Sequence, residues 1–142
     1  MSKSPYDTKK ITPSLYGDRS PVEGRVVAIL HVNFKDRGLK LIDTKSRAVL
    51  THEIHEIMIT DEKKAAPGGG ADRVAAVAFF EITKSGLIVT GDKVTAAGTK
   101  IGDLVGYDEN HMPNHLGIIL WAPTLDEPAL AVGDKIVFHI SG

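Results

Sequence analysis

The stretch 87–107, LIVTGDKVTAAGTKIGDLVGY, decides the fold class. Short apolar segments alternate in it with turn formers such as Gly91-Asp92. Glycine accepts a positive φ and aspartate bonds the local backbone, so the Gly-Asp pair predicts a tight turn before a strand. Gly133-Asp134 opens a near copy of the same tetrapeptide. The two copies indicate recurrent turn chemistry and not a true repeat.

Further along the chain in both directions, the same spacing of strands and turns recurs. Runs rich in β-branched residues and bounded by turn formers predict strands at 25–34, 39–43, 47–50, 51–60, 116–121 and 135–140. This spacing is typical of a β-meander and not of strands alternating with long helices. With 14 glycines and 7 prolines, it predicts an all-β fold, a single-domain compact β-barrel or barrel-like sandwich.

The start of the domain follows from where the strand pattern begins. It begins at Gly24, so we expect one β-barrel-like domain over 24–142. Residues 1–23 are polar and interrupted by prolines, which predicts an irregular N-terminal arm. The apolar run 74–83 is ambiguous, because its alanines permit a helix. Its Val, Phe and Ile residues favour a strand buried on both faces, and we predict a strand.

Length, charge and composition exclude several classes of function. The 142 residues fit one domain, and a formal net charge of -1 argues against nucleic-acid and membrane-surface partners. The absence of cysteine excludes disulfides, thiolate catalysis and Cys-ligated metals. No apolar run approaches the ~18 residues of a membrane span, and the N-terminus lacks a signal-peptide core. We therefore expect a cytoplasmic protein.

The densest polar cluster lies between two expected strands, at 106–115. Imidazole and carboxylate together suit divalent zinc, iron, manganese or nickel, so Asp108, His111 and His115 are candidate metal ligands. A His-x3-His spacing is diagnostic on a helix, but Pro113 makes an ordinary helix unlikely there. The alternative is a hydrogen-bonded turn whose polar side chains bond the backbone. In the same cluster, Tyr107 and Asn114 are candidate ligand-binding residues, and Tyr107 would supply an apolar wall together with Trp121.

A second cluster, HEIHE, occupies 52–56. On a strand, His52 and Glu56 share one face while Glu53 and His55 share the other. An inward His–carboxylate pair is a candidate acid–base site. We therefore predict His55 and Glu56 as catalytic and His52 as ligand-binding. The alternative is an exposed polar face.

Two further features are candidates. The loop at 67–73, PGGGADR, would expose glycine amides to an anion, with Arg73 binding a carboxylate or phosphate. The loop would act as a lid, or else be a flexible surface loop with a structural Asp72-Arg73 turn. Glu81 ends an apolar run. It either faces outward or is buried with a raised pKa, which would make it a catalytic general base.

The segment Ile101–His115 resembles a small prokaryotic family of domains of unknown function. The similarity extends back through Thr51-His52-Glu53 and the loop at 67–70, and so covers most of the chain after residue 24. The resemblance implies a self-contained small domain and no activity, substrate or catalytic residue.

From the residues themselves we expect a barrel that binds a small polar or anionic molecule in one mouth. The site would combine Asp108, His111 and His115 with residues across from them: His52, Glu53, His55, Glu56 or Arg73. A divalent metal would act as a Lewis acid or lower the pKa of a bound water, in lyase, isomerase or hydrolase chemistry. The alternative is a non-enzymatic structural or assembly module, a homo-oligomer formed through apolar strands such as 74–80.

Overall fold

The structure is a computed structural model that describes residues 19–112 and 114–140. All regular structure in these residues is β, as predicted. The strands are β1 (Val22–Phe34), β2 (Leu39–Lys40), β3 (Ser46–Val49), β4 (Ile54–Thr60), β5 (Gly70–Ala71), β6 (Val74–Lys84), β7 (Gly86–Val89), β8 (Lys93–Ala96), β9 (Thr99–Asp108), β10 (Gly117–Trp121) and β11 (Lys135–His139). Within the described ranges, no helix is long and apolar enough to cross a membrane.

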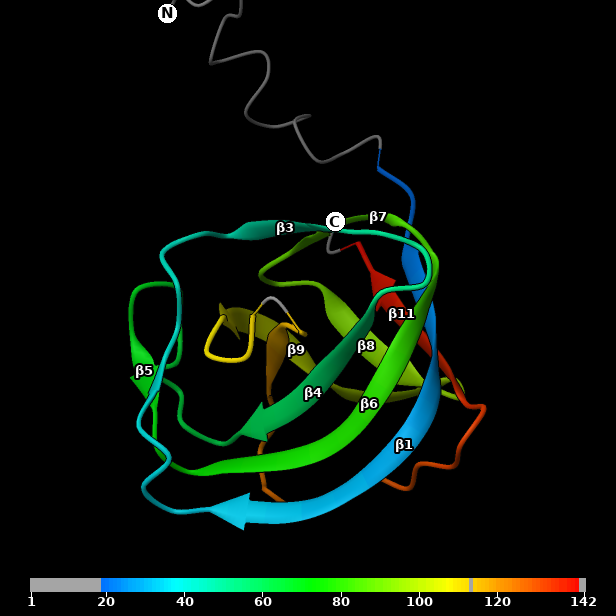
Figure 1. Cartoon of the computed structure of the whole chain (residues 1–142). Helices are drawn as coiled ribbons and strands as arrows, with labels where there is room; N and C mark the ends of the chain where they lie inside the picture. Colours follow the sequence, from blue (N-terminus) through cyan, green and yellow to red (C-terminus); the bar gives the residue numbers. More distant parts are fainter. Residues whose placement is uncertain (1–18, 113, 141–142) are drawn as a thin grey trace, which may run out of the picture.

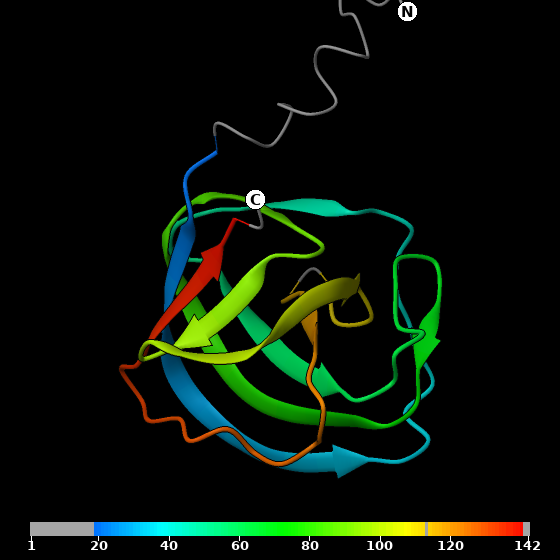
Figure 2. The ribbon, with the colours of Figure 1, turned by 180° about the vertical axis from the view of Figure 1, so that it is seen from behind.

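Seven strands close into a barrel-like ring in the order β1-β11-β8-β9-β10-β4-β6 (Figures 1 and 2). The neighbours pair antiparallel except β4 and β10, which run parallel. The expected meander is therefore wrong for the first strands: β2 pairs β5 and β3 pairs β7 in two small separate sheets. Turn spacing marks where a strand ends, but it does not select the strand's partner.

The ambiguous run 74–83 is confirmed as a strand. It forms β6, which pairs with β1 on one side and β4 on the other. Its first five residues are all buried, which matches the expected burial on both faces. Register shifts interrupt both pairings, and such bulges increase the bend of a long strand. The curvature of β1 and β6 around the ring is visible in Figure 1.

One apolar cluster fills the ring, and a second covers part of its outer wall. Ile57 and Ile118 belong to the cluster that fills the ring, to which all seven strands contribute. Their neighbours Met58 and Ile119 belong to a second cluster with Leu41, on the outer face of the same strands. This split follows from the alternation of side chains along a strand. It explains the consecutive apolar residues at 57–59 of β4 and 118–120 of β10.

The two Gly-Asp turns have the same local structure. Gly91 and Gly133 have φ values of 99° and 96°. Asp92 and Asp134 each accept a hydrogen bond from the amide three residues earlier, at 3.0 and 2.8 Å. Recurrent turn chemistry is therefore confirmed, and the turns differ only in their surroundings. Asp92 is buried and bound by Arg19, whereas Asp134 is half-buried.

The start of the domain differs slightly from the expectation. β1 begins at Val22, two residues before Gly24, and Val22 pairs with Phe138 of β11. Arg19, in the expected arm, donates to the Asp92 carboxylate through both terminal nitrogens, so the chain is held against the ring from there on. The rest of the arm, residues 1–18, lies outside the described residues.

Candidate metal centre

A row of aligned residues crosses four strands of the outer face. Asp108 of β9 pairs with Gly117 of β10, Gly117 pairs with Glu56 of β4, and Glu56 pairs with Phe79 of β6. Paired residues on neighbouring strands point to the same side of a sheet. Glu56 also shares its face with Met58 of the outer cluster. The row therefore lies on the outside of the ring and not in a mouth of the barrel, where we expected the site.

The connection between β9 and β10 brings two histidines above this row. The amides of Asn114 and His115 both donate to the carbonyl of His111, at 2.9 and 3.2 Å. A bond from residue i+4 to residue i closes one α-turn and places both side chains on one side. Their rings stack 4.9 Å apart at 22°. The described residues of this connection form turns and no helix, as we expected from Pro113, which itself lies outside the described part.

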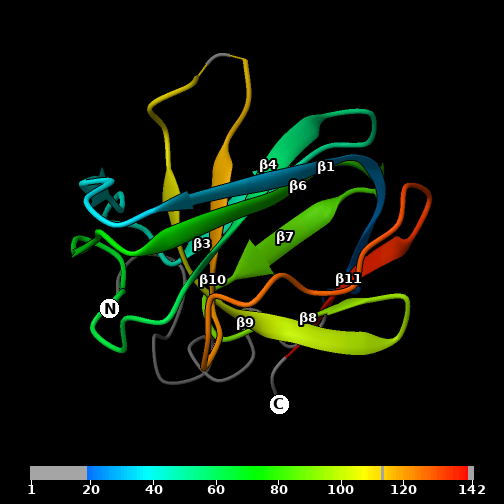
Figure 3. The same ribbon diagram turned by 90° about the horizontal axis from the view of Figure 1, so that it is seen from below.

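Three side chains converge at this point. The ligand atoms of Glu56, His111 and His115 all lie within 4.8 Å of one another. Glu56 Oε1 is 3.2 Å from His115 Nε2, and the edge of Phe79 packs on the His115 ring at 5.1 Å. Glu56 is buried, His115 is half-buried and His111 is exposed. A carboxylate anchored in the sheet therefore faces two imidazoles carried by the protruding connection, which extends beyond the strands in Figure 3.

These distances suit a divalent transition metal after a small closure. Metal–ligand bonds of about 2.1 Å place neighbouring ligand atoms about 3–3.5 Å apart. The separation of up to 4.8 Å exceeds that range by about 1.3–1.8 Å. His111 is exposed, so its side chain is free to supply the movement. Two imidazoles and one carboxylate suit zinc, iron, manganese or nickel and leave coordination positions for water or a small molecule.

The converging set differs from the expected one by a single member. We predicted Asp108 with His111 and His115, and the structure brings Glu56 to the two histidines. Glu56 was predicted as an acid–base residue, and its place beside His115 makes it a candidate ligand. Asp108 lies on the other side of Gly117 in the same row. The sequence carries no signal for this arrangement, because the parallel pairing of β4 with β10 joins segments about sixty residues apart.

His55 serves the fold. Its Nδ1 accepts a hydrogen bond from the amide of Leu116 at 3.0 Å, so its Nε2 carries the proton that is donated to Glu53, 3.0 Å away. Partial burial of Glu53 acts to raise its pKa, but hydrogen bonds from the Leu50 amide and His55 outweigh it, and the pKa is lowered. Both nitrogens of His55 are thus engaged within the protein, and the ring is not placed for proton transfer.

Glu81 faces outward, one of the two alternatives for this residue. It bonds His52 Nδ1 at 3.1 Å and Arg25 Nη2 at 3.0 Å. These two hydrogen bonds, His52 first, lower its pKa. That direction is opposite to the raised pKa that a general base would need. His52 is 84% exposed and has a φ of 79°, so it belongs to a surface turn.

The residues that we expected to contact a ligand beside the two histidines have other roles in the structure. Tyr107 is fully buried, and its hydroxyl lies 3.1 and 3.2 Å from the carbonyls of Lys45 and Ile88, where it holds β3 and β7 on the ring. Asn114 is exposed, and its amide contributes to the turn that carries the histidines. Trp121 lines a separate cavity of about 370 Å³ with Lys100 and Asp103.

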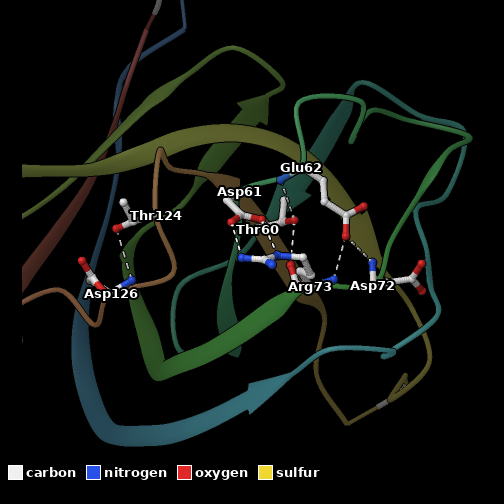
Figure 4. Close-up of polar contacts among 7 residues, drawn as sticks. All are labelled: Thr60, Asp61, Glu62, Asp72, Arg73, Thr124 and Asp126. Carbon is white, nitrogen blue, oxygen red and sulfur yellow. Dashed lines mark hydrogen bonds and ion pairs between the residues drawn. The ribbon is translucent and has the colours of Figure 1, made fainter.

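Arg73 and the glycine loop lie at the other end of β4. Arg73 binds Asp61 through Nε and Nη2 at 3.2 and 2.8 Å, and this hydrogen-bonded pairing raises its pKa (Figure 4). The Glu62 carboxylate accepts hydrogen bonds from the backbone amides of Asp72 and Arg73. The amides of Gly68 and Gly69 bond carbonyls of the protein. These donors bond acceptors of the protein, as in the structural-turn alternative, and do not form an open anion nest.

Comparison with known proteins adds one relationship. A model of a family of unknown function, DUF6917, matches residues 16–139. No curated protein and no solved structure matches the chain. The match spans the ring, the glycine loop and the β9–β10 connection, and it confirms the resemblance noted in the sequence. The chain belongs to the DUF6917 family, a family of unknown function.

Proposed function

We propose that this protein binds a divalent transition-metal ion through Glu56, His111 and His115 and presents it to a small polar or anionic molecule. The observation that carries the proposal is the convergence of three donor atoms within 4.8 Å. One donor comes from the sheet and two from an α-turn whose own hydrogen bonds orient them. Such a set is a normal metal-binding combination, and its exposed side leaves room for water and a ligand.

The chemistry that fits is metal-assisted hydrolysis, elimination or isomerisation. A bound cation would polarise an oxygen of the ligand or lower the pKa of a coordinated water. Glu56 is a ligand in this proposal, and its carboxylate already lies beside the His115 ring. Both ring nitrogens of His55 are engaged within the protein, and the pKa of Glu81 is lowered. Neither residue is therefore given a part in proton transfer. The protein's contribution is therefore to hold the metal with open positions.

The test is metal content and affinity. Untagged protein is stripped with a chelator and titrated with Zn²⁺ and with Mn²⁺ by calorimetry, alongside elemental analysis of protein purified without chelator. We expect about one ion per chain, and the double variant His111→Ala, His115→Ala should bind at least about 100-fold more weakly, because two of three ligands are gone.

The matched control removes two exposed histidines elsewhere. His31 bonds Glu127 and His139 bonds Thr95, both away from the row. The variant His31→Ala, His139→Ala should bind like the wild type. Absence of binding by the wild type, or equal loss in both double variants, would overturn the proposal.

An assembly module remains the alternative function. The two hypotheses separate on one geometric point: Asp108, His111 and His115 either point into a shared cavity with the 52–56 segment, or they splay into solvent or lie in a subunit interface. The contact of Glu56 with His115 favours the metal site. The apolar run 74–80, which suggested self-association, is buried between β1 and β4 and offers no free edge. Light scattering would reveal a homo-oligomer directly.

A further inference from the structure

Asp108 is a buried carboxylate with one oxygen in use and one without a partner. It is 1% exposed. Its Oδ1 accepts the amide of Asn110 at 3.0 Å, an ordinary turn contact. Its Oδ2 is shielded from solvent and has no hydrogen-bond partner among the described residues. A buried polar atom left unpaired is destabilising, so we expect a hydrogen-bond donor or a cation next to this oxygen.

Gly117 lies between Asp108 and Glu56 in the row and leaves a gap there, because it has no side chain. A Cβ built at Gly117 would lie 3.3 Å from the Asp108 Cβ and 3.6 Å from Oδ2. Asp108 Oδ2 therefore lies above the glycine, on the face to which Glu56 belongs. Every other residue type would place a side chain between the two carboxylates. The missing side chain therefore leaves a gap in the row of side chains between Asp108 and Glu56.

We infer that Asp108 is a further member of the metal site and accepts, through Oδ2, a hydrogen bond from a water bound to the cation. The inference rests on the proposed function. It accounts for both the orphaned oxygen and the gap at Gly117. Charge favours it too, because the carboxylates of Asp108 and Glu56 together balance a divalent cation when both imidazoles are neutral. Carboxylates that orient a metal's surroundings typically contribute 10–100-fold to affinity.

The decisive variant is Asp108→Asn. The amide keeps an oxygen for the Asn110 amide and nearly the same shape, but it replaces the orphaned oxygen by an NH₂ group. We expect Kd for Zn²⁺ and Mn²⁺ to rise about 10–100-fold, with one ion still bound per chain. The melting temperature in chelator serves as the folding readout. The control is Asp103→Asn, which alters a carboxylate of the same strand that pairs with Lys100, and it should leave both Kd values unchanged.

A second variant, Gly117→Ala, tests the gap while leaving Asp108 intact. Its methyl group would occupy the space between Asp108 and Glu56, so we expect a loss of affinity comparable to that of Asp108→Asn. It also gives the answer if Asp108→Asn does not fold. Wild-type affinity in whichever of these variants folds would overturn the inference while leaving the three-ligand site standing. Wild-type protein that binds neither ion would instead remove the proposed function itself.

Discussion

His55 and His115 offer the most informative comparison in the molecule. Each lies beside a glutamate, His55 at 3.0 Å from Glu53 and His115 at 3.2 Å from Glu56. In the first pair the second ring nitrogen accepts a backbone amide, so the pair is closed on itself. In the second, another imidazole stacks on the ring and adds a third donor. A histidine–carboxylate pair alone is therefore a structural device, and convergence of further donors makes a candidate site.

The substitution His55→Ala is expected to have the largest effect, and it tests whether His55 is structural while His115 belongs to the site. The substitution would leave the buried Leu116 amide without an acceptor and open a small void. We expect a loss of about 2–3 kcal/mol in the free energy of unfolding, measured by urea denaturation. Metal binding per folded molecule should persist, because His55 is not among the converging donors. Equal stability with lost metal binding would reverse the roles assigned to the two histidines.

A smaller effect concerns pH and the same pair. The pKa of Glu53 is lowered in the folded protein from its ordinary value of 4.5. Its contribution to stability is therefore present above pH 4.5 and is lost as the pH falls through the folded pKa. Glu53→Gln should make the stability less steeply dependent on pH in that acid window. Denaturation curves between pH 3 and pH 6, roughly, would measure this. A steeper dependence in the variant would contradict the assignment.

The smallest effect is expected at His52. It pairs with Glu81 on the surface and has a φ of 79°, which glycine adopts more readily. In His52→Gly, relief of the backbone offsets the loss of an exposed pair, so stability should stay within about 0.5 kcal/mol of the wild type. Thermal melts and Zn²⁺ titration should both match the wild type. Weakened metal binding would show that 52–56 contributes more than Glu56 to the site.

Much of the candidate site could be predicted from local patterns, and one part could not. The density of polar groups at 106–115 identified His111 and His115 without any structure. The ligand role of Glu56 depends on the parallel pairing of β4 with β10, which no local pattern encodes. Asp108 was predicted from the same cluster as the two histidines, and only its position across Gly117 from Glu56 depends on the strand pairing.

What the sequence by itself determined is local. The two Gly-Asp turns have the same φ at glycine and the same aspartate-to-amide bond, because these depend only on neighbouring residues. The all-β class and the identity of β6 as a strand follow from the same kind of pattern. Tertiary structure decided that Asp92 is buried against Arg19 while Asp134 is not. It also decided which strands close the ring and which carboxylate meets the histidines, because pairing between distant strands depends on the burial of whole faces.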